Sequence, residues 1–268
     1  MLVHGILGFN RLTLGGVKIA EYFRDVPQAL RDAGHIIPTP PRLNQAGAIA
    51  DRAQDLKNYL EDENNVDVFG KRVHILAHSM GGLDTRYMIS KLGMEDRIIS
   101  LTTISTPHHG SPIADLFRDV TDPRLVPLVK SLGGNIDGSL DLTIESMREF
   151  NDVIFDSPKV HHFAVAGKSP TFLGRSWDIA KHLHRIIQEK EGDSDGIVSV
   201  ASASFGQARE NWTFLGTWKA NHFREMNWGK NVIPSFWEKL DKSIIKNYID
   251  LVAQVKDLVA KRESAAKS

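Results

Sequence analysis

Apolar positions along this chain follow two different periods. Short apolar runs rich in β-branched residues, each bounded by turn-forming residues, predict strands at 73–79, 98–106 and 160–167. Nearer the N-terminus, apolar residues recur at helical spacing, which predicts helices over 21–34 and 49–64. Strands that alternate with crossover helices indicate an α/β fold, with a mostly parallel sheet and helices on both of its faces.

Two other segments have patterns of their own. Residues 111–145 combine apolar helical stretches with prolines and a Gly133-Gly134 break, which fits either a mobile helical lid or an ordinary pair of surface helices. Near the C-terminus, one apolar face at helical spacing predicts a helix from about 240 to 261 that docks on the rest of the protein. No repeat or linker divides the sequence, so we expect residues 1–268 to form one domain.

Composition removes several classes of partner and chemistry. Hydrophobic residues make up 41% of the 268 and charged residues 25%, as in an ordinary globular protein. Lys plus Arg and Asp plus Glu balance at 33 each, so charge gives no reason to expect nucleic acid as a partner. The absence of cysteine excludes disulfides, thiolate metal sites and cysteine nucleophiles. No apolar run approaches the roughly 20 residues of a transmembrane helix.

The start of the chain leaves the compartment open. There is no charged start followed by an apolar core, so we expect no signal peptide in this chain, which as it stands would be cytoplasmic. Only three residues precede His4-Gly5, although a strand usually runs to about five or six. A trimmed N-terminus is therefore an alternative, and we take a monomer as the default oligomeric state.

The leading candidate for chemistry is Ser79, at the end of the strand predicted over 73–79. In a doubly wound sheet, ligands bind beyond the carboxyl ends of the strands. The segment AHSMG (77–81) fits the G-x-S-x-G turn that exposes a nucleophilic serine, with Ala77 in place of the first glycine. The competing interpretation is that Ser79 only caps the following helix. The small flanking residues and the strand-to-helix setting favour a nucleophile.

A serine hydroxyl is a poor nucleophile until a base removes its proton. Of the 11 histidines, His222 lies near the chain end, where the Ser, Asp/Glu, His order of such folds places the base. His78 adjoins the candidate nucleophile, and we expect it to point away from Ser79. The remaining histidines considered are less suited to the role of base: His74, His108, His109 and His161.

The acid of such a triad is expected between Ser79 and His222. The segment EGDSDGIVSV offers Asp193 and Asp195. Asp195 is the better candidate, because Asp-Gly followed by a β-branched run sets a carboxylate on a tight turn. Its role would be to hold the imidazole in the correct tautomer and to stabilise the imidazolium. The alternatives are that Asp193 takes this role, or that both aspartates only form a solvated turn.

Acyl transfer also needs N–H donors for the oxyanion that develops on the substrate. In this arrangement one donor is the backbone N–H after the nucleophile, here Met80, and the other comes from an early strand–helix loop. The segment VHGILGF opens such a loop after the first strand, and we assign Ile6 as the second donor.

Together these segments resemble a known family. In chain order, HGILGF, EYFRDVPQALRDAGH, AHSMGG, STPHHGSPIAD, SDGIV and NHFREMN resemble the bacterial true lipases of the Pseudomonas and Burkholderia type, from residue 3 to about 228. HSMGGLDTRYMIS is also similar to eukaryotic triacylglycerol lipases. The resemblance implies an α/β-hydrolase fold with a helical lid. It also implies a carboxylic ester hydrolase that uses a Ser–His–Asp triad and an acyl-enzyme, often at a lipid–water interface.

One departure from the family concerns metal. The family's calcium site takes an aspartate two residues after the catalytic histidine, and here that position is Arg224, so we expect neither calcium there nor any cofactor. A lipase acting on fatty-acid esters is the first hypothesis. The alternatives are a short-chain carboxylesterase, a phospholipase or thioesterase, and a non-catalytic binding protein of the same fold. Acyl-chain length and stereopreference are left open.

Overall fold

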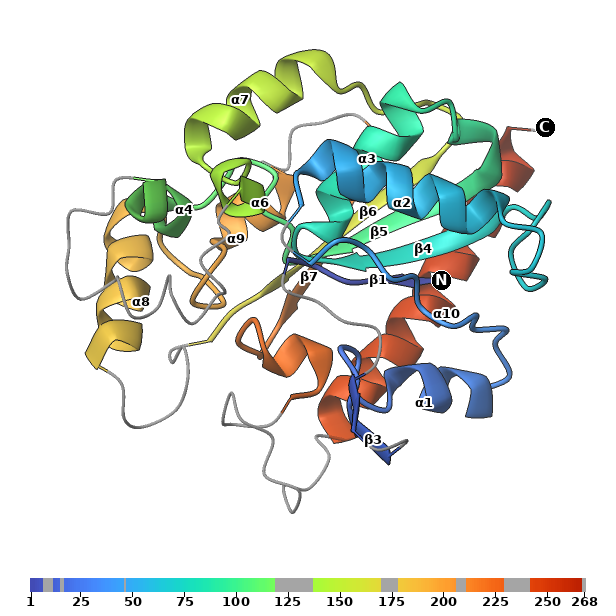
Figure 1. Cartoon of the computed structure of the whole chain (residues 1–268), viewed down its shortest axis with the longest axis horizontal. Coiled ribbons are helices and arrows are strands. Elements are labelled where there is room, and N and C mark those ends of the chain that lie inside the picture. Colours follow the sequence, from blue (N-terminus) through green and yellow to red (C-terminus); the bar gives the residue numbers. More distant parts are fainter. Residues whose placement is uncertain are drawn as a thin grey trace.

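The computed structural model describes residues 1–6, 12–14, 17–45, 47–118, 137–169, 178–205, 211–228 and 242–266. Its centre is a five-stranded sheet in the order β1-β4-β5-β6-β7, and every neighbouring pair in it is parallel (Figure 1). The strands are β1 (Leu2–Val3), β4 (Val73–His78), β5 (Ile98–Ile104), β6 (His161–Gly167) and β7 (Trp212–Trp218). The three predicted strands are therefore confirmed, each ending within two residues of its predicted bounds.

Two strand features were not predicted. β2 (Leu12–Leu14) and β3 (Val17–Ala20) pair antiparallel with each other, outside the main sheet. β7 is an edge strand in which no residue is fully buried, so its sequence WTFLGTW lacks the continuous apolar run that identified the central strands.

Helices cover both faces of the sheet, as predicted (Figure 1). On one face, α2 (Ile49–Glu61) and α3 (Gly81–Lys91) pack against inward-facing side chains such as Ile75 and Ala77. On the other face, α1 (Val26–Asp32) and α10 (Lys242–Ala265) pack with Leu76 and Phe163. Because side chains alternate along a strand, β4 contributes to both cores, and this double burial explains its continuous apolar sequence.

The helix predictions hold with shifted ends. The helix predicted over 21–34 begins only at Val26, with Pro27 in its first turn, where the missing N–H of proline costs no hydrogen bond. The C-terminal helix runs to Ala265 and docks through five buried side chains, as expected: Ile244, Tyr248, Leu251, Val255 and Val259. None of the described helices is long and apolar enough to cross a membrane.

The remaining helices gather at one end of the sheet (Figure 1). They are α4 (Pro112–Arg118), α6 (Asp137–Leu140), α7 (Ile144–Val153), α8 (Asp178–Glu191) and α9 (Val200–Ala203). Two short 3₁₀ helices complete the description, η1 (Glu95–Arg97) and η3 (Arg224–Met226). Most of the predicted lid, including Gly133-Gly134, lies outside the described residues, so the lid stays a prediction.

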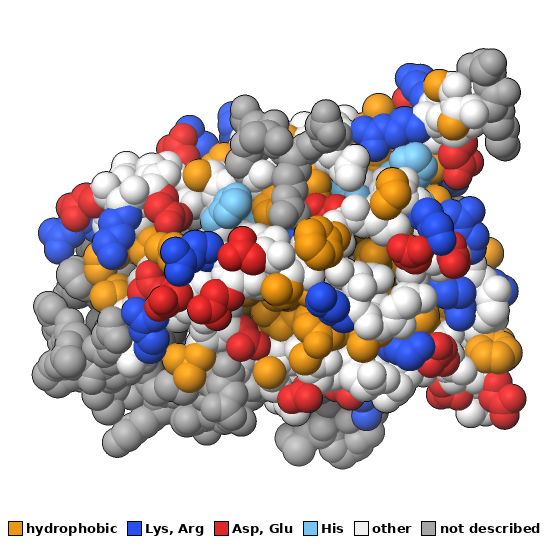
Figure 2. Space-filling view, turned by 90° about the horizontal axis from the view of Figure 1, so that it is seen from above, with side chains coloured by type: hydrophobic (Ala, Val, Ile, Leu, Met, Phe, Trp, Pro, Cys, Tyr) orange, Lys and Arg blue, Asp and Glu red, His pale blue; other side chains and the backbone are white. Residues whose placement is uncertain are grey.

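Charged side chains of both signs are interspersed over the face seen in Figure 2. This distribution agrees with the equal numbers of acidic and basic residues in the sequence.

Candidate active site

Ser79 stands on a strained turn between β4 and α3. Its φ angle is 55°, in the left-handed region that non-glycine residues seldom adopt. Two backbone hydrogen bonds hold it there, from its N–H to the carbonyl of Ile104 (2.9 Å) and from the Gly82 N–H to its own carbonyl (3.1 Å). The helix N-cap is Met80, not Ser79, so the capping interpretation of this serine is not supported.

The glycine after Met80 has a steric reason. A Cβ at Gly81 would lie 2.8 Å from the carbonyl oxygen of His4 and 2.9 Å from that of Val3. Any larger residue would therefore push the start of α3 away from the end of β1. This close approach places the turn that carries Ser79 against the early loop that contains Ile6, the assigned oxyanion donor.

His222 and Asp195 lie together at the same end of the sheet. The His222 Nδ1–H donates to Asp195 Oδ2 at 2.6 Å. The other carboxylate oxygen of Asp195 accepts the N–H groups of Ile197 and Val198, both at 2.8 Å. Asp195 is fully buried and His222 nearly so. With Nδ1 committed to the carboxylate, Nε2 is the ring nitrogen left to act as a base.

The choice between the two aspartates has a geometric answer. The Asp193 side chain is exposed and forms an ion pair with Lys168 at 2.6 Å. Asp195 contacts His222, and Asp193 does not. The geometry therefore supports Asp195 as the acid. Asp193 instead lies on the solvent-exposed turn that was considered as an alternative for both aspartates.

The two assigned oxyanion donors belong to neighbouring segments. Ile6 packs on the apolar cluster that contains Met80. Within the described part of the chain, neither the Ile6 N–H nor the Met80 N–H donates a hydrogen bond to a protein acceptor. Gly5, one residue before Ile6, instead donates its N–H to the Tyr22 hydroxyl at 3.0 Å. Two unused donors in adjacent segments are what an oxyanion site requires.

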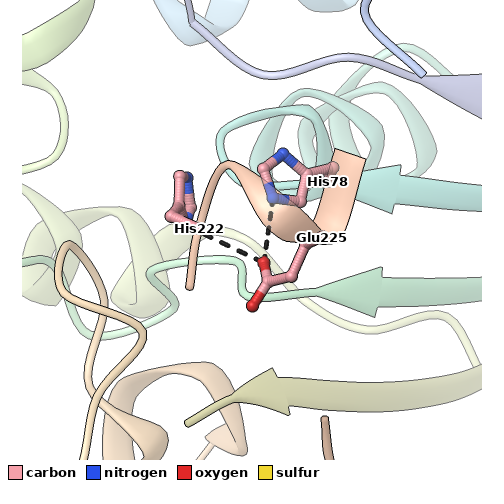
Figure 3. Close-up of side chains that lie close together, drawn as sticks. All are labelled: His78, His222 and Glu225. Carbon is pink, nitrogen blue, oxygen red and sulfur yellow. Dashed lines mark hydrogen bonds and ion pairs between the residues drawn. The ribbon is translucent and has the colours of Figure 1, made fainter. Parts of the chain in front are cut away.

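A second histidine–carboxylate pair, which was not predicted, lies beside His222 (Figure 3). His78 Nε2 is 3.0 Å from Glu225 Oε2, and both side chains are fully buried. The ring of His78 lies in the core, with its centroid 4.5 Å from that of His222. Glu225 Oε2 is also 3.9 Å from His222 Nδ1. Glu225 stands three residues after the candidate base, but nothing in the sequence linked it to His78.

Burial dominates the electrostatics of this second pair. It raises the pKa of Glu225 well above the usual glutamate value, and the nearby Asp195 carboxylate raises that pKa further. Burial and the neighbouring His222 hold the pKa of His78 well below the usual histidine value. Both shifts favour the uncharged forms of the two side chains.

His78, His222 and Glu225 each offer a potential metal-ligand atom, and the three atoms lie within 4.8 Å of one another. Those atoms already bond to protein groups: His78 Nε2 to Glu225, and His222 Nδ1 to Asp195. As the side chains stand, the cluster forms a hydrogen-bond network, and a metal ion held by both His78 Nε2 and Glu225 would have to replace the bond between them.

Two of the other histidines considered as a base have structural partners. His74 Nδ1 hydrogen-bonds the Ser100 hydroxyl at 2.8 Å. His108 Nε2 bonds the Thr103 hydroxyl at 3.1 Å, and its ring packs on Phe205. Neither contact involves the candidate triad, in agreement with the lower rank given to these residues.

No model of a known protein family matches the chain. Individual relatives do. Triacylglycerol lipase 2 of Saccharomyces cerevisiae is 32% identical over 230 residues, which cover 82% of this chain and 66% of that protein. A triacylglycerol lipase of Pseudomonas fragi is 31% identical over 118 residues, 44% of this chain and 37% of that protein. The match thus spans about two thirds of the yeast relative and just over a third of the bacterial one.

Among solved structures, the Staphylococcus hyicus lipase superposes on the whole chain. Its TM-score is 0.69 at 16% identity, with 96% of that protein covered. This likeness confirms the predicted α/β-hydrolase fold. Together with the yeast and bacterial relatives, it shows that the chain belongs to the lipase family of the α/β-hydrolases.

Proposed function

We propose that the protein hydrolyses carboxylic esters, with lipid esters as its substrate class, through Ser79, His222 and Asp195. The observation that carries this proposal is the 2.6 Å hydrogen bond from His222 Nδ1 to Asp195, formed at the end of the sheet where Ser79 occupies its strained turn. The triacylglycerol lipase names of the sequence relatives support the substrate class.

The reaction would follow from the roles of these groups. His222 Nε2 takes the proton of the Ser79 hydroxyl as its oxygen attacks the ester carbonyl carbon, and the Ile6 and Met80 N–H groups hold the resulting oxyanion. His222 then gives the proton to the departing alcohol, which leaves an acyl-enzyme on Ser79. Water then attacks the acyl-enzyme ester while His222 takes its proton, which forms a second tetrahedral intermediate. As this intermediate breaks down, the carboxylic acid leaves and His222 returns the proton to the Ser79 oxygen.

We also propose that this chemistry proceeds without calcium. Arg224 places a cation where the family's aspartate ligand would stand, and its N–H donates to the Asn221 side chain at 2.9 Å. Addition of a chelator such as EDTA should leave both the rate and the melting temperature unchanged. A loss of activity that added calcium restores would contradict this proposal.

The test of function is hydrolysis of p-nitrophenyl esters of increasing acyl length by the wild type and Ser79→Ala side by side. Robust wild-type turnover that Ser79→Ala abolishes would support the proposal. An optimum at long acyl chains, with a rate increase above the solubility limit, would identify a lipase, and an optimum at short soluble esters would identify a carboxylesterase. Equal slow turnover by both proteins would refute the proposal.

A further inference from the structure

The loop that carries Ile6 is held at two successive peptide units. His4 Nδ1 lies 2.9 Å from the carbonyl oxygen of Gly5, in the unit that contains the Ile6 N–H, and the unit before it is held at both ends. Arg52 Nη2 donates to the carbonyl oxygen of His4 at 2.8 Å, and the Gly5 N–H donates to the Tyr22 hydroxyl oxygen at 3.0 Å. This carbonyl and this N–H belong to the same planar peptide bond. Because both of its ends bond to buried side chains, the plane cannot rotate freely, and the direction of the next N–H, that of Ile6, is restricted with it.

The same loop lies directly against the nucleophile. A Cβ at Gly5 would stand 2.8 Å from Ser79 Cβ and 2.9 Å from the Tyr22 hydroxyl oxygen. The Gly5 backbone therefore fills the space between the serine and the tyrosine. A movement of the loop would change the position of the Ile6 N–H relative to Ser79, and thus relative to any oxyanion formed there.

Tyr22 is itself fixed from the core. Its hydroxyl is 2.7 Å from His78 Nδ1, and His78 Nε2 is 3.0 Å from Glu225 Oε2. The Ser105 hydroxyl donates to the other Glu225 oxygen at 2.8 Å. These hydrogen bonds link side chains from Ser105, directly after strand β5, through the second histidine–carboxylate pair, to the early loop.

The direction of these hydrogen bonds does not alter their effect on the loop. A backbone N–H can only donate, so the Tyr22 oxygen accepts from Gly5 in either tautomer of His78. With an ionised Glu225, the Tyr22 O–H donates to His78 Nδ1 and the Nε2–H donates to the carboxylate. With a protonated Glu225, its O–H donates to Nε2 and the Nδ1–H donates to the Tyr22 oxygen.

We propose that Tyr22 is a positioning residue of the oxyanion hole, and that its hydroxyl, anchored by His78 and Glu225, sets the orientation of the Ile6 N–H through Gly5. This inference rests on the proposed ester hydrolysis by Ser79. It gives the second histidine–carboxylate pair a role that does not involve proton transfer to substrate.

Tyr22→Phe removes only the tyrosine hydroxyl, and the variant still has the Ile6 N–H donor. Loss of a complete oxyanion donor costs about 10²–10³ in kcat, so a donor that is present but less well aimed should cost less. We expect kcat to fall by roughly 10- to 100-fold, with KM for a short soluble p-nitrophenyl ester unchanged within about twofold.

The structure supplies a matched control in Tyr248→Phe. Tyr248 is also a fully buried tyrosine, and its hydroxyl has no hydrogen-bond partner within the described part of the chain. It contacts Phe23 and Trp218 on the α10 side of the sheet. This substitution removes the same atom from the same type of environment, so we expect wild-type kcat and KM.

The experiment measures kcat, KM and the inhibition constant of an alkylboronic acid for the wild type, Tyr22→Phe and Tyr248→Phe. A boronic acid forms a tetrahedral adduct with the serine and places an oxygen in the oxyanion hole, so its binding reports the alignment of the donors. We expect Tyr22→Phe to weaken boronate binding by about the same factor as it lowers kcat. Circular dichroism confirms that each variant is folded at the assay temperature.

Two results would overturn the inference. One is a folded Tyr22→Phe with wild-type kcat and boronate affinity, and the other is an equal loss in Tyr248→Phe, which would show a general effect of core hydroxyls. If Tyr22→Phe does not fold, His78→Gln frees the same hydroxyl from its other end and should lower kcat in the same sense, and unchanged kcat there would count against the inference. Failure of the proposed function would look different: the wild type and Ser79→Ala would then hydrolyse the ester at the same rate.

Discussion

The two histidine–carboxylate pairs lie side by side at the carboxyl end of the sheet, but their surroundings differ. The Asp195 carboxylate accepts two backbone N–H groups in addition to His222, and the His222 side chain keeps a small exposed area. The Glu225 carboxylate accepts a serine hydroxyl in addition to His78, and neither member of that pair is exposed.

This difference explains how two histidine–carboxylate pairs can have different roles. Two backbone N–H donors and His222 hold the Asp195 side chain in place, and a carboxylate so placed stabilises the imidazolium that forms when His222 takes up a proton. Burial raises the pKa of Glu225 and lowers that of His78, so taking up a charge at this second pair is opposed. The first pair is suited to moving a proton, and the second to holding neighbouring groups in place.

The largest effect should separate the two histidines. His222→Gln removes the proposed base, and we expect kcat for ester hydrolysis to fall by about 10⁴-fold or more. His78→Gln leaves the triad intact and should lower kcat by only about tenfold, through Tyr22. Steady-state kinetics on one soluble ester compares them, and equal losses in the two variants would break the distinction.

A second prediction separates the two neighbouring aspartates. Asp195→Asn reverses the hydrogen bond to His222 Nδ1 and favours the wrong tautomer, so kcat should fall on the order of 10²–10⁴-fold. Asp193→Asn changes only an exposed ion pair with Lys168, and the rate should stay within about twofold of wild type. A larger loss in Asp193→Asn than in Asp195→Asn would mean that the acid has been assigned to the wrong residue.

The anchor of the second pair should affect stability more than rate. Ser105→Ala removes the hydroxyl that donates to Glu225 and that accepts the Gly167 N–H, both at 2.8 Å. Leaving these buried groups unpaired should lower the free energy of unfolding by about 1–3 kcal/mol. Urea unfolding measures the loss, and kcat should change by less than tenfold. A drop in kcat as large as that of His222→Gln, with unchanged stability, would place the second pair in the chemistry.

The smallest effect concerns a buried histidine that has no carboxylate bonded to it. Burial lowers the pKa of His162 to about 4, so between about pH 6.5 and 4 the unfolded chain binds a proton there that the folded chain does not. The stability that neutral His162 contributes is therefore complete above about pH 6.5 and is lost as the pH falls towards 4. The stability difference between wild type and His162→Gln should shrink by up to about 1.4 kcal/mol per pH unit in this window.

Urea midpoints at pH 7, 6 and 5 for wild type and His162→Gln measure that slope. A difference that is constant with pH would show that His162 titrates alike in the folded and unfolded states. It would also contradict the lowering of the His162 pKa by burial.

Much of the fold and of the candidate triad could be predicted because the signals are local. The double burial of β4 produces an apolar run in VHILAH, and the turn after it needs small residues around Ser79. His222 could be chosen by its place in the chain. The preference for Asp195 came from the Asp-Gly turn, and the structure places that carboxylate against His222.

The parts that could not be predicted depend on contacts between distant segments. Glu225 meets His78 across 147 positions of sequence, and nothing near either residue signals the other. The link from Tyr22 to Gly5 is likewise formed only when the segment before α1 and the early loop fold onto the end of β4. β7 was missed because an edge strand with partly exposed faces lacks the apolar run that identifies a central strand.

The most direct test of the account is the rate at which a fluorophosphonate labels Ser79 in the wild type, His222→Gln and His78→Gln, followed by intact-protein and peptide mass spectrometry. We predict a single adduct on Ser79 in the wild type, labelling within about tenfold of that rate in His78→Gln, and none detectable in His222→Gln. Labelling of Ser79 at the wild-type rate in His222→Gln, or an adduct on another residue, would contradict the claim that only the Asp195–His222 pair activates the serine.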